Sequence, residues 1–232
     1  MSIPEAVLRF ASHLLWPLSC PFCGALGESA CVICLRRLLD PPMPIDLDGL
    51  SLSAGGEHDG AMRELVLELK YGSDRVLGVA MGRALGETFP RPDADLLVPV
   101  PLHRGSERAF NQSAAIAEGV GGVWGIPVLD GLAWNERRAA QTSLGITERQ
   151  MMPADVLRPV KKGISGKRVM LVDDVATTGT TLLRAADAIR RGGGFAVSAL
   201  SWTHAQRLKS PRSLSDNRYE EKSFSHRGDD NA

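Results

Sequence analysis

The chain alternates between two kinds of hydrophobic pattern. Short apolar runs bounded by Gly, Pro or Asp are typical of buried strands, and longer segments with apolar residues every three or four positions indicate helices. The runs predict strands at 93–101, 126–134, 156–160, 167–174 and 195–202, and the periodic segments predict helices at 61–71, 75–89, 110–120 and 178–193. Because strands and helices alternate, we expect an α/β domain over residues 59–204, with a parallel sheet flanked by helices.

Three further segments surround this predicted domain. Residues 1–18 carry one apolar stripe and predict an N-terminal helix. Such a helix could lie on a membrane surface or pack on the neighbouring domain, and the lack of a basic polar face favours packing. Residues 39–58 are rich in Pro, Gly and Asp, which predicts a linker with one edge strand near Leu50. Residues 205–232 are strongly polar and predict a disordered tail.

Composition narrows the class of protein. The 232 residues carry no formal net charge. This argues against general electrostatic binding of nucleic acid but is compatible with a local basic patch. No apolar run is long enough for a membrane span, and the N-terminus lacks the charge order and cleavage site of a signal peptide. We therefore expect a cytoplasmic protein. Basic candidates for a single-stranded DNA surface are Arg104, Arg108, Arg137, Arg138, Lys161, Lys162, Lys167 and Arg168.

All cysteines lie in one short segment. Cys20, Cys23, Cys31 and Cys34 form two CxxC pairs within residues 19–38. Each pair can point two thiolates at one centre, so two pairs complete a tetrahedral sulfur shell that suits Zn²⁺. Two disulfides or four free thiols are the alternatives, and a reducing cytosol argues against disulfides. Four thiolates leave no open coordination position, so the expected zinc is structural.

The stretch RVMLVDDVATTGTTL, residues 168–182, carries the candidate chemistry. A buried strand ends in Asp173 and Asp174, at the edge where open α/β sheets bind ligands. The following turn opens a helix, and backbone N–H groups at a helix start favour an anion such as phosphate. The aspartates suit vicinal hydroxyls beside that phosphate, so the stretch predicts a ribose 5-phosphate site. The turn consists of Thr177, Thr178, Gly179, Thr180 and Thr181.

Other interpretations of this stretch are weaker. The chain has no GxxxxGK[ST] and no GxGxxG after a strand, which excludes the common nucleotide-phosphate loops. An ordinary strand-to-helix turn capped by an aspartate remains the structural alternative. Capping needs only one side chain, whereas this stretch supplies two aspartates and four threonines around one glycine.

The stretch resembles the phosphoribosyl diphosphate (PRPP) motif of type I phosphoribosyltransferases. The tandem CxxC pairs, followed by LELKYGSD, VPVPLH, FNQS, QTSLGITERQ and the PRPP motif, occur in the order seen in the ComF family. This resemblance covers roughly residues 15–203. It implies a type I phosphoribosyltransferase-like sheet preceded by a small zinc module, and a role in natural transformation or the use of imported DNA.

The resemblance also implies roles for matching residues. Asp173 and Asp174 would hold the ribose hydroxyls and offset the positive charge that develops on the ring, which is the catalytic role. The threonine-glycine turn would bind the 5-phosphate, and Mg²⁺ would accompany PRPP. The diphosphate and a closing loop would involve Leu102, His103, Arg104, Arg137, Gln141 and Arg149. Each arginine could equally be a solvated loop charge, and Lys70 could simply extend from the end of its helix.

Two functions remain open at this stage. The first is a ComF-like protein that binds PRPP or a nucleotide 5-phosphate, with single-stranded DNA or competence-machinery proteins as candidate partners. The second is a conventional purine or pyrimidine phosphoribosyltransferase of salvage or biosynthesis. The cysteine pairs favour the first, because a metabolic transferase has little use for them. Whether the protein turns over PRPP or only binds it is left open.

Overall fold

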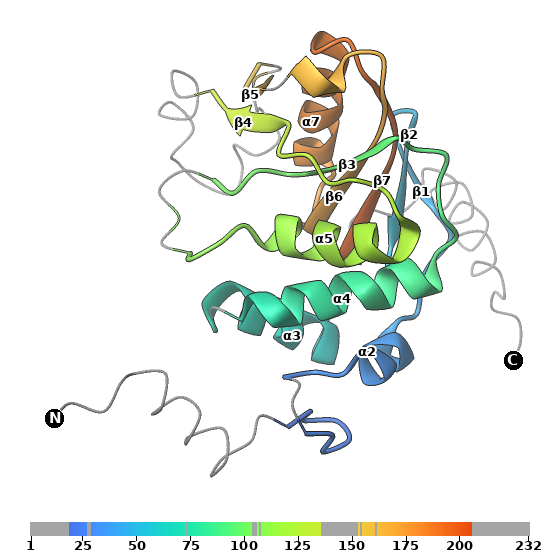
Figure 1. The fold of residues 1–232 in the computed structure, drawn as a ribbon, viewed down its shortest axis with the longest axis vertical. Helices are drawn as coiled ribbons and strands as arrows, with labels where there is room; N and C mark the ends of the chain where they lie inside the picture. Colours follow the sequence, from blue (N-terminus) through green and yellow to red (C-terminus); the bar gives the residue numbers. More distant parts are fainter. Residues whose placement is uncertain are drawn as a thin grey trace, which may run out of the picture.

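The core of the molecule is a mostly parallel sheet. The computed structural model describes residues 19–26, 29–72, 74–103, 106, 108–135, 153, 155–160 and 162–205. Within these residues, five strands pair in the order β1-β2-β7-β6-β3, and only the β1–β2 pair is antiparallel (Figure 1). The strands are β1 (Ile45–Leu47), β2 (Leu50–Ala54), β3 (Leu96–Pro99), β6 (Arg168–Ala176) and β7 (Phe195–His204).

Helices cover both faces of this sheet, as the alternating sequence pattern predicts. Figure 1 shows α3 (Gly60–Tyr71), α4 (Arg75–Thr88) and α5 (Gln112–Trp124) on one side, and α7 (Thr180–Arg191) on the other. Two separate apolar clusters result, one on each face of β6: Met170 and Val172 belong to the first, and Val169 and Leu171 to the second. The α/β architecture with helices flanking a parallel sheet is therefore confirmed.

The segment 39–58, expected to be a linker with one edge strand near Leu50, contributes two strands to the sheet, and the second of them, β2, begins at Leu50. Residues of β1 and β2 alternate between buried and outward positions. Asp48 and Gly49 connect the strands, both with positive φ, of 46° and 85°. An Asp-Gly pair in this conformation is a preferred two-residue hairpin turn. The prolines at 41, 42 and 44 favoured a linker, but the Asp-Gly signal flanked by alternating leucines outweighs them.

A second difference concerns the run at 126–134. Only β4 (Leu132–Trp134) is a strand there, and it pairs antiparallel with β5 (Leu157–Pro159) in a separate two-stranded sheet. Val128 makes one isolated bridge to Leu97 of β3. Gly131 lies between these two pairings, so the run turns away from the main sheet after its first residues. The short 3-10 helix η2 (Lys162–Ile164) follows β5.

Glycines bring α4 and α5 unusually close together. A Cβ atom on Gly82 would lie 2.0 Å from the carbonyl oxygen of Ile116, and one on Gly119 would lie 2.1 Å from that of Val79. Neither position therefore has room for a side chain. The close packing fixes α5 against α4, and α5 also contacts β6, so the first turn of α5 has a defined place beside the end of β6.

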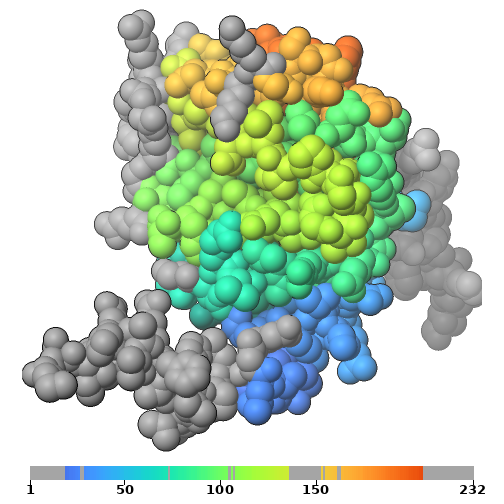
Figure 2. All heavy atoms as spheres, viewed as in Figure 1, coloured from blue at the N-terminus to red at the C-terminus, as the bar shows by residue number. Residues whose placement is uncertain are grey.

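The cysteine segment forms a small module at one end of the molecule. Figure 2 shows it in blue, against the helices drawn in teal. Its helix α2 (Val32–Leu38) contacts α4, and Arg36 of the module pairs with Glu87 of α4 at 3.1 Å. Among the described residues, no helix combines the length and apolar character that a membrane crossing requires. The segments 1–18 and 206–232, predicted as a helix and a disordered tail, lie outside the described residues.

Candidate functional site

The candidate site lies at the carboxyl end of β6, between β7 and β3. β6 is buried along most of its length, and its last residues include the two aspartates of the predicted motif. Both aspartates are buried. About 9% of the surface of each residue is exposed. Buried charges need partners, and the two aspartates satisfy that need in different ways.

Asp173 points toward α5. Ser113 Oγ donates a hydrogen bond to Asp173 Oδ1 at 3.0 Å, and the backbone N–H of Asp174 donates to the same oxygen at 2.9 Å. Burial, and then the negative charge of Asp174, raise the pKa of Asp173 from 3.8 to about 7. The folded protein thus binds this proton more tightly than the unfolded chain. The stabilisation from this group is present at acidic pH and is lost as pH rises through 7.

Asp174 forms an ion pair with Lys70. The distance from Lys70 Nζ to Asp174 Oδ2 is 3.0 Å, and both side chains are largely shielded from solvent. Lys70 lies at the last turn of α3, so its partner comes from a distant part of the chain. The sequence allowed only that Lys70 extends from its helix, whereas the structure places its ammonium group at the site.

The turn after β6 leads into the N-terminus of α7 through a left-handed glycine. Gly179 adopts a left-handed conformation, with φ of 72°, and is the N-cap of α7. Thr178 and Thr180 share a hydrogen bond of 2.9 Å between their hydroxyls. Neither aspartate caps α7, because Asp173 contacts Ser113 and Asp174 contacts Lys70. The aspartate-cap interpretation is therefore excluded.

A cavity of about 370 Å³ connects these features. Asp174 and Lys70 form one part of its wall, and the threonines of the turn form another. His103 and Trp134 contribute an aromatic part, with ring centroids 4.9 Å apart in an edge-to-face arrangement. The lining residues are His58, Lys70, His103, Trp134, Asp174, Val175, Thr177, Thr178, Thr180 and Thr181. The cavity thus combines a carboxylate, an ammonium group, hydroxyls and a helix N-terminus.

The structure separates some residues that the sequence grouped together. Asp173 is absent from the lining of this cavity, since its carboxylate turns to Ser113. Leu102 lines a different cavity, beside Phe110 and Leu132, whereas its neighbour His103 reaches the one described here. A Cβ on Gly179 would meet Leu47 at 2.8 Å, so this glycine is required by packing as well as by its φ. Arg104, Arg137, Gln141 and Arg149 lie outside the described residues.

Sequence reasoning missed His58 as a site residue. It follows β2, which pairs parallel with β7, and this pairing carries the 55–58 segment to the carboxyl edge of the sheet. The backbone N–H of His58 donates to the carbonyl of His204 at 2.8 Å. A lone histidine in a glycine-rich stretch offered no signal for this position, which depends on the parallel pairing of β2 with β7 inside the sheet, whereas the sequence predicted only an edge strand near Leu50.

One of the cations expected on a basic surface, Arg168, is paired with carboxylates. Arg168 forms ion pairs with Asp93 and with Asp95, the latter at 3.2 Å. A hydrogen bond from the backbone N–H of Arg168, followed by contacts with its side chain, lowers the pKa of Asp95. Arg108 donates to Gln112 Oε1 at 3.2 Å, and Lys167 is exposed. Arg168 is therefore neutralised by neighbours, unlike the free charge that the sequence suggested.

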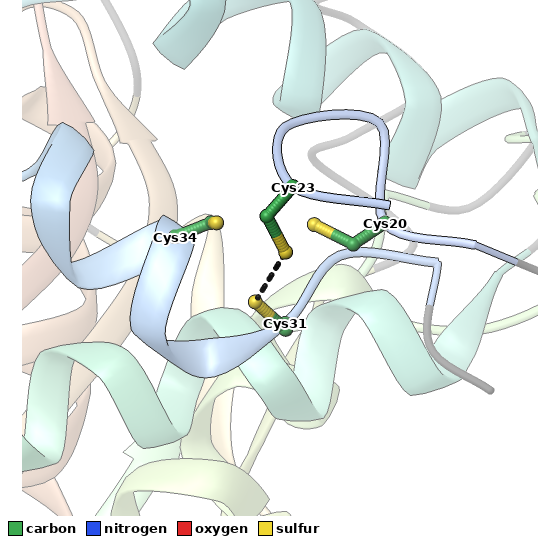
Figure 3. Close-up of side chains that lie close together, drawn as sticks. All are labelled: Cys20, Cys23, Cys31 and Cys34. Atoms are coloured by element: carbon green, nitrogen blue, oxygen red, sulfur yellow. Dashed lines mark hydrogen bonds between the residues drawn. The ribbon is translucent and has the colours of Figure 1, made fainter. Parts of the chain in front are cut away.

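The four cysteines form a second candidate site, in the module. All four are free of disulfides, and their sulfur atoms lie within 4.8 Å of one another. Figure 3 shows the four side chains converging, with Cys23 and Cys31 Sγ 3.6 Å apart. Four sulfurs at about 2.3 Å from a tetrahedral zinc would lie about 3.8 Å from one another. The residues therefore fit a four-coordinate Zn²⁺.

Electrostatics within the cluster also favour a cation. Burial alone would raise the pKa of Cys20, but hydrogen bonds from the backbone N–H groups of Cys31, Phe22 and Cys23 lower it to about 6. Hydrogen bonding to Cys31, followed by burial, raises the pKa of Cys34 to about 12. The thiolate of Cys20 therefore forms readily, whereas ionisation of Cys34 is opposed. A metal ion would remove that opposition by balancing the charge.

The fold and the site together define a class of protein. The parallel sheet, the buried aspartates that end its central strand and the threonine-glycine turn that opens α7 make an α/β domain of the type I phosphoribosyltransferase kind. Residues 104–226 match the family described as "Phosphoribosyl transferase domain", a span of more than half the chain. The chain belongs to this family.

Relatives of similar length define the branch more narrowly. The chain is 25% identical over 215 residues to "Competence protein ComFC" of Streptococcus pneumoniae, covering 85% of this chain and 94% of that protein. It is 26% identical over 191 residues to "DNA utilization protein YhgH" of Escherichia coli, covering 77% and 80%. These matches, with the cysteine cluster, confirm the resemblance to the ComF family.

Two further comparisons show similarity that is limited in coverage or in structural agreement. A "Ribose-phosphate pyrophosphokinase" of Thermococcus kodakarensis is 32% identical over 136 residues, or 59% of this chain, which spans only 40% of that protein. Among solved structures, an adenine phosphoribosyltransferase from Thermoanaerobacter pseudethanolicus aligns over 80% of this chain and 94% of its own, with 14% identity and a TM-score of 0.41.

Proposed function

We propose that this protein binds PRPP, or another ribose 5-phosphate, in the cavity at the carboxyl end of β6. The observation that carries the proposal is the arrangement of that cavity, in which Asp174 and Lys70 face the same space as the threonine turn at the N-terminus of α7. The helix N-terminus and hydroxyls suit a phosphate, and the carboxylate suits ribose hydroxyls. One ligand that presents both groups is a ribose 5-phosphate.

The proposed roles differ between the two aspartates. Asp174 would accept hydrogen bonds from the ribose, in competition with Lys70. Asp173 would support Asp174 without contacting the ligand, because its carboxylate is held by Ser113 outside the cavity lining. The turn residues Thr177, Thr178, Thr180 and Thr181, with the backbone at Gly179, would bind the phosphate. Among the described residues that were predicted to bind the diphosphate, His103 is the one that lines this cavity.

Mg²⁺ fits this donor set. Protein sites for Mg²⁺ commonly supply one or two carboxylates and leave the remaining positions to water and substrate phosphates. Asp174 is the carboxylate that lines the cavity, so it would hold the ion together with a bound diphosphate. When bound, the metal would neutralise charge on the diphosphate leaving group. The cysteine module would hold a structural Zn²⁺.

Calorimetric titration of the purified protein with PRPP and MgCl₂ tests the proposal. We expect one PRPP per chain with a dissociation constant at or below the millimolar range, and weaker binding of ribose 5-phosphate, which lacks the diphosphate. MgCl₂ alone serves as the control titration. If neither PRPP nor any nucleoside 5′-monophosphate produces binding heat at millimolar concentration, the ribose-phosphate assignment fails.

We further propose that the protein acts in natural transformation or in the use of imported DNA. The names of the relatives that match most of the chain support this role, as does the cysteine module, which a metabolic transferase has little need for. The alternative is a conventional purine or pyrimidine phosphoribosyltransferase. That alternative would require the protein to release diphosphate from PRPP rapidly when a free base is supplied as acceptor.

Direct contact with DNA is expected to be weak and salt-sensitive. The chain has no net charge, and Arg168, one of the candidate cations, is paired with Asp93 and Asp95, so the electrostatic attraction to DNA is small. Fluorescence anisotropy with a labelled single-stranded oligonucleotide at low salt should detect binding at micromolar protein. The Lys167→Gln variant should reduce the salt slope by about 0.7 if Lys167 contacts a phosphate. No binding at micromolar wild-type protein would exclude direct contact and leave a role through protein partners.

A further inference from the structure

We propose that His58 is the general base of this site, taking a proton from the nucleophile that attacks the ribose. This inference rests on the proposed binding of a phosphoribosyl group. It assigns a chemical role to a residue that carries none in the PRPP motif and that lies far from that motif in the chain.

His58 is placed within reach of a bound phosphoribosyl group. It lines the same cavity as Asp174, Lys70 and the threonine turn. It comes from the segment between β2 and α3, whereas the PRPP motif comes from β6 and α7, so the cavity wall joins the two. A ligand bound between Asp174 and the turn would therefore have the imidazole as part of its surroundings.

The ring of His58 is held in one orientation. Its Nδ1 lies 2.8 Å from Thr203 Oγ1, and its backbone N–H donates to the carbonyl of His204. Both partners belong to β7, so the central sheet fixes the ring as well as the main chain. Within the described part of the chain, Nδ1 is the ring nitrogen with a hydrogen bond, which leaves Nε2 available to an incoming group. A positioned imidazole with one free nitrogen is the usual arrangement of a histidine base.

The surroundings keep this imidazole in its neutral form at pH 7. Burial, followed by the positive charges of Lys70 and Arg63 on α3, lowers the pKa of His58 below its ordinary 6.5. The carboxylates of Asp174 on β6 and of Asp59, the next residue in the chain, act in the opposite direction but do not outweigh them. Burial and the two cations together therefore favour the neutral imidazole, which can accept a proton.

Other lining groups are less suited to this task. Asp174 is engaged by Lys70 at 3.0 Å, and threonine hydroxyls are very weak bases. His103 is exposed and packs edge-to-face against Trp134. His58 is the half-buried histidine of the cavity with a hydrogen bond to the sheet, so the geometry favours it over His103.

The proposed step balances as follows. The nitrogen of an acceptor N–H group forms a bond to C1′ of the ribose, while the bond from C1′ to the diphosphate oxygen breaks. Diphosphate leaves with that electron pair, and the N–H proton passes to Nε2 of His58. Solvent then removes the proton from the imidazolium and restores the neutral base. The inferred acceptor therefore carries an ionisable N–H group, and free nucleobases serve as probes of that chemistry.

The test measures diphosphate release and PRPP binding on the same proteins. Wild type, His58→Gln, Thr203→Val and Arg63→Gln are assayed with PRPP and MgCl₂, using adenine, guanine, hypoxanthine and uracil as acceptor probes. His58→Gln should lower kcat by about 10²- to 10⁴-fold and change the PRPP dissociation constant less than about threefold. Thr203→Val, which keeps the imidazole but removes its hydrogen-bond partner, should cost about fivefold in kcat.

The pH profile separates a chemical role from a structural one. In wild type, kcat should rise with pH through the pKa of His58 and then reach a plateau, because only the neutral ring accepts a proton. His58→Gln should lose that rise. Arg63→Gln, which removes one cation acting on the ring, should shift the rise to higher pH and leave the plateau unchanged. Thermal melts of all variants identify any that fail to fold.

The possible failures are distinguishable. If wild type does not bind PRPP, the proposed function fails and the role of His58 fails with it. If wild type binds PRPP but releases no diphosphate with any probe, binding stands and the base assignment is overturned. It is also overturned if His58→Gln retains wild-type kcat and its pH rise. If His58→Gln folds but no longer binds PRPP, His58 is a binding residue.

Discussion

Replacing Asp174 by asparagine is expected to weaken PRPP binding by about ten- to a hundredfold, which corresponds to roughly 1.5–3 kcal/mol for a charge-assisted hydrogen bond. The substitution keeps the size of the side chain but removes the charge that faces the cavity and accepts from Lys70. Titration calorimetry with PRPP and MgCl₂ measures the effect. Unchanged affinity in a folded Asp174→Asn protein would show that the carboxylate does not contact the ligand.

The same substitution also leaves a largely buried ammonium group unpaired. Lys70 has 18% of its side chain exposed, so loss of its partner is expected to destabilise the fold by about 3 kcal/mol. The double variant Lys70→Met/Asp174→Asn removes both charges and should recover much of that stability while binding PRPP no better. Thermal melts beside the titrations therefore separate the ligand contact from the ion pair.

Gly179 is a poor position at which to test the threonine-glycine turn, because it is also constrained by packing. A valine there would need a left-handed backbone and would place its Cβ 2.8 Å from Leu47. Loss of PRPP binding in such a variant would combine steric exclusion of the phosphate with damage to the β1–α7 packing. Asp174→Asn avoids this ambiguity, since its backbone conformation suits any residue.

Loss of the cysteine-bound metal should have the largest effect on stability. Purified protein is expected to contain one zinc per chain, and Cys31→Ser should lose it. Structural zinc sites contribute about 10–16 kcal/mol of apparent binding free energy, which becomes folding free energy of the module. Elemental analysis measures the zinc content, and thermal melts with and without a chelator measure the destabilisation.

Ile33→Ser provides a matched control for Cys31→Ser. Ile33 lies in the same short helix, between two of the cysteines, but its side chain is 65% exposed. It should keep its zinc and melt close to wild type. If metal-free protein folds with unchanged stability, or if Ile33→Ser loses metal as readily as Cys31→Ser, the four cysteines do not form a structural zinc site.

Local features of this protein were readable from the sequence because their parts are close together in the chain. The PRPP motif is contiguous from the strand through the turn to the helix, and local propensities suffice to build it. The cysteine pairs are likewise confined to one segment, and short spacings restrict where their sulfurs can point. The alternating strand and helix patterns predicted the parallel sheet for the same reason.

The remaining features depended on which strands pair. β2 lies next to β7 because its leucines complete an apolar face, and this pairing alone brings His58 to the end of the sheet. Lys70 reaches Asp174 across more than a hundred residues, and Ser113 turns Asp173 away from the cavity. No local pattern encodes these contacts, because each arises from the packing of whole elements. The sequence by itself therefore determined the threonine-glycine turn and the cysteine cluster, and tertiary packing decided which charged and titratable groups line the cavity.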